Sequence, residues 1–221
     1  MPTYFLIYGV YLLSLILGCA LTGCLLVNKG WSPAYKLLVL LPAVTLVVEG
    51  TSTYLIYNRI NGVWIYHVWL PLETATIVYF LTREAVHPAV RRLNTIFWAS
   101  LPVAIATCFI IHPGFRRANV LIMTFYLFVN LVVSCAVLID ILKDGTDRSI
   151  FSRPVSWMAI GILFYSSIFI VVYSVGESLQ ILGYPIYVPF SYAANTFMYG
   201  GCIACFVARS REGRGKSSVS L

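Results

Sequence analysis

Charged residues are scarce in this chain. They make up 10% of the 221 residues, whereas a soluble domain carries about 25%. Hydrophobic residues make up 60%, and the mean hydropathy is +0.86. A soluble domain of this composition could not cover its surface with polar groups, so the sequence excludes that class. The apolar runs are continuous rather than short and alternating, which excludes a lipid-facing β-barrel and predicts an all-α membrane protein.

The chain also lacks the patterns on which several kinds of site depend. It has no HExxH or other metal-ligand spacing, no Gly-rich phosphate loop and no nucleophile elbow, so we expect neither a metal site nor a cofactor. The last apolar run has no lysine to hold retinal, which excludes an opsin. The six cysteines all fall inside apolar runs, and Cys202 and Cys205 are expected to pack between helices rather than to react.

Seven apolar runs are long enough to cross a bilayer about 30 Å thick, which takes about 20 helical residues. The first run has no basic segment before it, so it is predicted to be a span and not a cleavable signal peptide. Short connections should make consecutive helices antiparallel neighbours. The predicted spans are residues 4–27, 36–57, 64–81, 94–111, 118–142, 154–174 and 186–208.

Basic residues gather on one side of these spans. Of the 15 lysines and arginines, only Arg59, Arg116 and Arg117 fall on the other side. The positive-inside rule then predicts the N-terminus outside and the C-terminus in the cytoplasm. Because the basic residues mark topology, the net charge of +7 does not indicate a nucleic acid partner. We expect a polytopic protein of the cell (inner) membrane, with one seven-helix bundle over residues 1–209 and a basic, disordered cytoplasmic tail over residues 210–221.

Two of the predicted spans carry a carboxyl group well inside the span, Glu49 in the second and Glu73 in the third, whereas Asp140 lies at the cytoplasmic end of the fifth. A charged side chain at the centre of a spanning helix costs about 2.5–3.5 kcal/mol on insertion scales, so both are candidate functional residues. A structural role is the alternative for Glu73, because a protonated carboxyl group could donate to the backbone carbonyl that Pro71 leaves free.

Counting 1.5 Å per helical residue places further polar groups at the depth of these carboxyl groups, roughly 12–18 Å below the outer surface. Charged and amide side chains avoid lipid, so we expect a polar cavity inside the bundle with aromatic walls. Asn130 and Asn195 could instead form interhelical hydrogen bonds, worth about 0.6 kcal/mol each. The expected substrate-binding residues are Asn195, Asn130, Tyr126, Tyr165, Tyr54 and Trp69.

Two carboxyl groups in such a cavity can perform acid-initiated chemistry without a metal or cofactor. A buried carboxyl group holds its proton, because a low dielectric constant disfavours the charged form. It can protonate an alkene or epoxide, aromatic walls can stabilise the carbocation, and a second group can collect the final proton. This predicts cyclisation or isomerisation of a hydrophobic, isoprenoid-bearing substrate, with Glu49 as the acid and Glu73 as its partner or the base.

The layout resembles the small seven-helix membrane terpene cyclases of fungal and bacterial meroterpenoid pathways. Those proteins place an essential acid in the second helix, which Glu49 matches, and the segments 130–138 and 189–192 resemble the family's spacing. The resemblance implies a terpene cyclase or isomerase. The segments 64–73 and 161–165 also resemble uncharacterised seven-helix membrane proteins of Bacteroidetes, which implies no function.

Two positions depart from the cyclase pattern. Val48 stands where the family has a tryptophan before the helix-two acid, and Asn195 lies near the family's second acid in the seventh helix. An amide cannot protonate an epoxide. Either Glu73 has taken that role, or the chemistry differs, or no catalysis remains.

Two further functions compete with an enzyme. One is a binding or sensing module that holds a small lipid or quinone without catalysis, although no output domain is present to pass on a signal. The other is a proton-coupled carrier that uses both glutamates, which the lack of internal repeats disfavours. The expected partners are the lipid bilayer and a hydrophobic small molecule, and the sequence identifies no protein partner.

Overall fold

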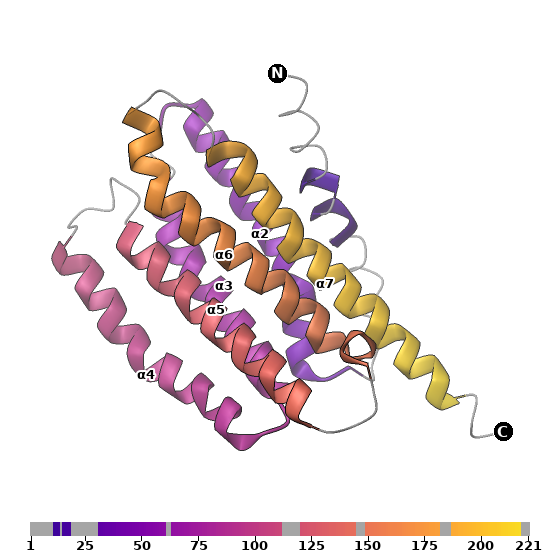
Figure 1. Cartoon of the computed structure of the whole chain (residues 1–221). Helices are drawn as coiled ribbons and strands as arrows, with labels where there is room; N and C mark the ends of the chain where they lie inside the picture. Colours follow the sequence, from indigo (N-terminus) through magenta and orange to yellow (C-terminus); the bar gives the residue numbers. More distant parts are fainter. Residues whose placement is uncertain are drawn as a thin grey trace.

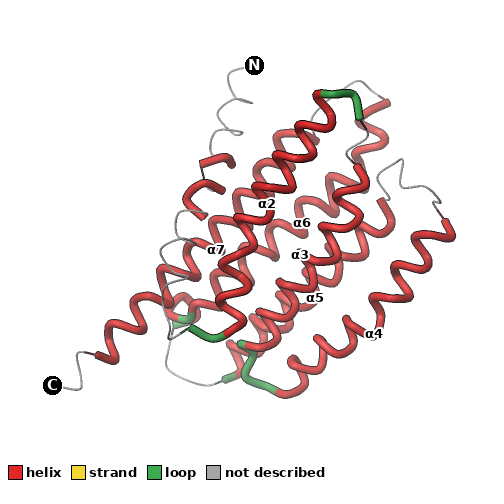
Figure 2. Tube along the Cα trace, turned by 180° about the vertical axis from the view of Figure 1, so that it is seen from behind, coloured by secondary structure: helices red, strands yellow, loops and turns green. Residues whose placement is uncertain are grey.

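The computed structural model describes residues 11–13, 15–18, 31–60, 63–111, 120–144, 149–181 and 187–217. Within these residues the chain is helical and forms no strand (Figures 1 and 2). The elements are α2 (Pro33–Tyr57), α3 (Val63–Arg83), α4 (Pro88–Ile111), α5 (Val120–Lys143), the short 3-10 helix η1 (Ile150–Ser152), α6 (Pro154–Ile181) and α7 (Tyr187–Ser217).

The helix ends follow local signals in the sequence. Helices α2, α4 and α6 begin at Pro33, Pro88 and Pro154, where a fixed φ and a missing N–H suit the first helical position. Helices α3 and α5 end on Arg83 and Lys143, whose charges complement the negative end of the helix dipole. Every described residue of the six runs predicted after the first lies in a helix.

The structure covers little of the first predicted span but most of the predicted C-terminal tail. Of the first predicted span, the structure describes only residues 11–13 and 15–18, and these are helical. The predicted disorder of the tail is wrong for residues 210–217, because α7 continues to Ser217 and extends past its neighbours (Figure 1). An ion pair of 2.9 Å between Arg209 and Glu212, three residues apart, supports this last part of the helix.

Among the described residues, three helices are long and apolar enough to cross a membrane. These segments are Pro33–Ser52 in α2, Ile122–Lys143 in α5 and Pro154–Val175 in α6. Large apolar side chains such as Val47 and Val171 remain exposed on the outside of the bundle. Exposed apolar side chains of this kind suit contact with lipid rather than with water. The fold is therefore that of a helical membrane protein.

Helix α3 lies at the centre of the bundle, against α2, α4, α5 and α6, whereas α4 lies at the edge against α3 and α5 (Figures 1 and 2). The most extensive contact is between α6 and α7. Cys202 and Cys205 of α7 are free thiols in the buried core, so the prediction that they pack between helices is confirmed. The same core contains residues of α2, α3, α4, α5 and α6.

Glycine allows the close approach of α6 and α7. A Cβ atom on Gly161 would lie 2.7 Å from the backbone oxygen of Phe197, and one on Gly201 would lie 2.7 Å from that of Trp157. No other residue fits these two positions without moving a backbone. Small residues at a helix contact are typical of membrane bundles, where close packing replaces the hydrophobic effect as a source of stability.

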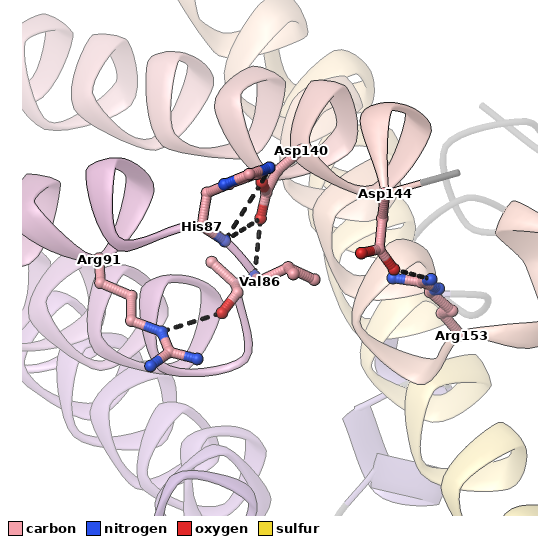
Figure 3. Close-up of polar contacts among 7 residues, drawn as sticks. Val86, His87, Arg91, Asp140, Asp144 and Arg153 are labelled. Carbon is pink, nitrogen blue, oxygen red and sulfur yellow. Dashed lines mark hydrogen bonds and ion pairs between the residues drawn. The ribbon is translucent and has the colours of Figure 1, made fainter. Parts of the chain in front are cut away.

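A buried carboxylate holds the connection between α3 and α4. Asp140 of α5 is 3% exposed. It accepts hydrogen bonds from the backbone N–H groups of Val86, at 2.7 Å, and of His87, at 3.1 Å (Figure 3). These two donors precede α4 and have no partner within the helix. Asp140 thus ties the start of α4 to the end of α5.

Candidate functional site

A cavity of about 170 Å³ lies inside the bundle, and both glutamates line it. Helix α2 contributes Thr45 and Glu49, and α5 contributes Met123. Helices α3, α6 and α7 supply the remaining side chains, most of them aromatic or polar. Five helices therefore enclose one small chamber that contains two carboxyl groups.

The α2 side of the cavity is built around Glu49. Its carboxyl group is half-buried, and the hydroxyl group of Tyr66 from α3 donates a hydrogen bond to its Oε2 at 3.1 Å. Thr45 lies four residues before Glu49, which places both on one face of α2. The hydrogen bond orients the Glu49 carboxyl group toward α3.

Glu73 lies deeper, with 4% of its surface exposed. The hydroxyl group of Tyr165 on α6 lies close enough to interact with the Glu73 carboxyl group as a hydrogen-bond donor. Glu49 is also close enough to act on Glu73 electrostatically. Each glutamate is therefore paired with a tyrosine of another helix, and the two carboxyl groups influence one another across the cavity.

The far wall comes from α6 and α7. Phe169 and Tyr173 continue the α6 side from Tyr165, and α7 supplies Asn195 and Tyr199. Tyr199 is 1% exposed, and its hydroxyl oxygen is buried without a hydrogen-bond partner. Lys, Arg and His are absent from the described residues that line the cavity. The polar character of the chamber comes from carboxyl, phenol, hydroxyl and amide groups.

Five residues predicted for the site meet at this cavity. Glu49, Glu73, Trp69, Tyr165 and Asn195 all line it, as the depth estimate predicts. Their roles in binding or catalysis stay predictions.

Three other predicted residues lie elsewhere. Tyr54 is 66% exposed on the outside of α2, so its predicted place in the cavity is wrong. Asn130 is buried, and its amide lies 3.5 Å from the hydroxyl group of Thr74 on α3, which is the interhelical contact that the alternative interpretation predicts. Tyr126 is buried in the core and does not line the cavity.

The sequence interpretation misses several lining residues, although a signal for them exists. Tyr66 and Leu70 precede Glu73 by seven and three residues, so they share its face of α3. Phe169 and Tyr173 follow Tyr165 at intervals of four. A search at helical spacing from each predicted polar residue would find them.

Another partly buried glutamate, Glu84, lies outside the cavity, directly after the end of α3. The hydroxyl group of Ser32 donates to Oε1 of Glu84 at 3.4 Å. Burial raises the pKa of the Glu84 carboxyl group, while the charge of Arg209 and the Ser32 hydrogen bond oppose that shift. Glu84 is thus a partly buried glutamate that shares the chemistry of Glu49 but not its location.

The fold and the cavity together define a helical membrane protein with a polar, aromatic chamber between its helices. Comparisons of the chain with protein-family models, with curated proteins and with solved structures found no match. In the part of the chain that the structure describes, no group of three His, Cys, Asp or Glu side chains could hold a metal ion.

Proposed function

We propose that this protein is an integral membrane enzyme that catalyses acid-initiated cyclisation or isomerisation of a hydrophobic, isoprenoid-bearing substrate without a cofactor. The observation that supports this proposal is the meeting of Glu49 and Glu73 in one chamber with aromatic walls. A proton donor, a proton acceptor and surfaces that attract a cation are the groups that such a reaction needs. The resemblance to membrane terpene cyclases agrees with the proposal.

The reaction begins with proton transfer from Glu49 to the substrate. With an alkene, the π electrons form a new C–H bond; with an epoxide, the oxygen takes the proton and a C–O bond breaks. Either step leaves a carbocation, which the ring faces of Trp69, Phe169 and the tyrosines attract. A second alkene or a phenol oxygen then supplies the electron pair for the new C–C or C–O bond.

The last step removes a proton from the cyclised cation. At the start the two carboxyl groups hold one proton between them, on Glu49, and the hydroxyl group of Tyr165 stabilises the Glu73 carboxylate. Glu73 then accepts the proton from the cation, and this proton returns to Glu49 across the cavity that both residues line. Substrate and product then have the same composition, and no proton is consumed. In the proposal Tyr66, Tyr165 and Asn195 hold the two carboxyl groups and the substrate in position.

The size of the cavity limits what it can enclose. Its volume of about 170 Å³ is below the range of about 300–1,000 Å³ typical of sites for drug-sized ligands. In the proposal, the chamber therefore holds only the reacting end of the isoprenoid, and the remainder of the chain extends between helices toward the lipid. A substrate dissolved in the membrane can enter in this way.

The proposal includes seven spans in the cell (inner) membrane, with the N-terminus outside and the C-terminus in the cytoplasm. A green fluorescent protein fused after Leu221 should then fluoresce, and alkaline phosphatase at the same place should be inactive. Inserted between Asn61 and Gly62, the two reporters should give the opposite results. Active phosphatase at the C-terminus would exclude this orientation.

Membranes that contain the protein should convert a suitable substrate to an isomer. We would incubate them with prenylated phenols, prenylated quinones and their terminal epoxides, and separate the products by chromatography with mass detection. The expected product has unchanged mass and altered retention, and is absent from membranes without the protein. Recovery of a bound but unaltered compound from folded protein would contradict catalysis and support a lipid-binding or sensing module.

A further inference from the structure

A second, smaller pocket lies between the end of α3 and the first turns of α4. Its volume is about 100 Å³, and it is lined by Tyr79, Thr82, Arg83, Arg91 and Asn94. Two of these five residues are arginines, and none is acidic. The pocket therefore concentrates positive charge and hydrogen-bonding groups in a space much smaller than the usual ligand site.

The two arginines are available to a ligand in different ways. Arg91 donates from Nε to the backbone oxygen of Ala85 at 3.0 Å (Figure 3). This bond holds the guanidinium in place and leaves its Nη groups for another acceptor. Arg83 makes no hydrogen bond or ion pair with any residue in the described ranges. The neighbouring carboxyl group of Glu84 is bound by Ser32 and does not line the pocket.

Hydrogen bonds fix the backbone beside the pocket. The connection between α3 and α4 is tied to Asp140 through the N–H groups of Val86 and His87. The buried amide oxygen of Asn94 has no hydrogen-bond partner. A buried acceptor without a donor costs free energy, so this oxygen is suited to a ligand that brings an O–H or N–H group.

The pocket lies near the level at which a helix long and apolar enough to span a membrane ends. Asp140, which anchors the connection beside the pocket, lies near the end of the membrane-spanning segment Ile122–Lys143. Phospholipid phosphates occupy this level, and basic pockets between membrane helices bind them. Arginine suits a phosphate because its planar fork forms parallel charge-assisted hydrogen bonds.

We propose that Arg83 and Arg91 bind the phosphate of one membrane phospholipid, whose head group also donates a hydrogen bond to Asn94. This site is separate from the cavity of the proposed enzyme and does not depend on its chemistry. Phosphatidylglycerol meets both requirements, because it carries a phosphate and free hydroxyl groups. In the proposed orientation the lipid belongs to the cytoplasmic leaflet.

Native mass spectrometry of the purified protein in a neutral detergent tests this site with phosphatidylglycerol as the probe. We expect one retained lipid per chain, and binding weaker by about tenfold or more in Arg83→Gln and in Arg91→Gln. Arg83 is exposed and makes no hydrogen bond or ion pair with the described residues, so its replacement should disturb folding little. Arg92→Gln is the matched control, because Arg92 is exposed and does not line the pocket.

The same measurement separates the possible ligands. Diacylglycerol, which lacks the phosphate, should not be retained, and millimolar inorganic phosphate should not displace the phospholipid. Equal weakening by Arg92→Gln would assign binding to diffuse surface charge and overturn the proposal. Retention of diacylglycerol would show that binding does not depend on the phosphate. Displacement by inorganic phosphate would show that the ligand is a free anion rather than a lipid. Unchanged binding in both Arg83→Gln and Arg91→Gln would exclude the site.

Discussion

Glu49→Gln should reduce conversion of a verified substrate by at least about 100-fold, because general acid–base catalysis contributes about 10²–10⁴-fold. Glutamine keeps the shape of glutamate and can still accept from Tyr66, but it cannot transfer a proton to carbon or to an epoxide oxygen. Glu73→Gln should have a comparable effect, because the final proton then has no carboxylate to accept it. Product formation at substrate saturation, measured by chromatography, reports both losses.

The control for these variants is Glu84→Gln. Glu84 is a partly buried glutamate outside the cavity, so its replacement should change turnover by no more than about twofold. Each variant should elute as folded protein in size-exclusion chromatography before its activity is compared. Full turnover by folded Glu49→Gln would exclude it as the acid. If Glu73→Gln retained activity while Glu49→Gln lost it, Glu49 would remain the acid and a group other than Glu73 would accept the final proton.

Gly201→Ala should lower the thermal unfolding temperature by about 2–12 °C, because overpacking costs about 1–3 kcal/mol. The added methyl group would lie 2.7 Å from the backbone oxygen of Trp157 and 2.9 Å from Cα of Gly161. Only a shift of one helix relieves two backbone contacts. Gly161→Ala should lower the unfolding temperature in the same way, because its added methyl group would lie 2.7 Å from the backbone oxygen of Phe197. Unfolding in detergent, followed by fluorescence on heating, measures the change.

Gly200→Ala is the matched control for this prediction. It is the preceding residue of the same helix, and a Cβ atom there meets nothing within 4 Å. Alanine in place of glycine inside a helix is favourable by about 0.5–1 kcal/mol when no contact opposes it. We therefore expect an unchanged or slightly raised unfolding temperature. A fall equal to that of Gly201→Ala would show that the close contact of α6 and α7 does not limit stability.

The two glycine contacts also bear on the cavity. Helix α6 carries Tyr165 and Phe169, and α7 carries Asn195 and Tyr199, so their separation sets the width of the chamber. Neither glycine lines the cavity. Residual folded Gly201→Ala protein should therefore show altered substrate affinity with both carboxyl groups still present.

Helix position and depth could be predicted from the sequence because both depend on local properties. An apolar run of about 20 residues must be helical in lipid, where every backbone polar group needs an internal partner. Depth then follows from counting along the run at 1.5 Å per residue. This is why Glu49, Glu73, Tyr165 and Asn195 could be predicted to share a level, and why all four line one cavity.

The sequence did not predict which face of each helix points into the bundle. Lipid chains are as apolar as a protein core, so a membrane helix shows little difference between its buried and exposed faces. Tyr54 and Tyr66 illustrate this limit: both are tyrosines near one end of a span, but Tyr54 is exposed and Tyr66 binds Glu49. Only the packing of α2 against α3 distinguishes them.

The sequence by itself determined the class of protein, six of its helices, and the depth of Glu49 and Glu73. The tertiary structure decided which side chains meet, because contacts between helices depend on rotation and spacing that no local pattern encodes. It placed Asn130 against Thr74 instead of in the cavity. It also brought Arg83 and Arg91, which the sequence presents only as topology markers, into one pocket.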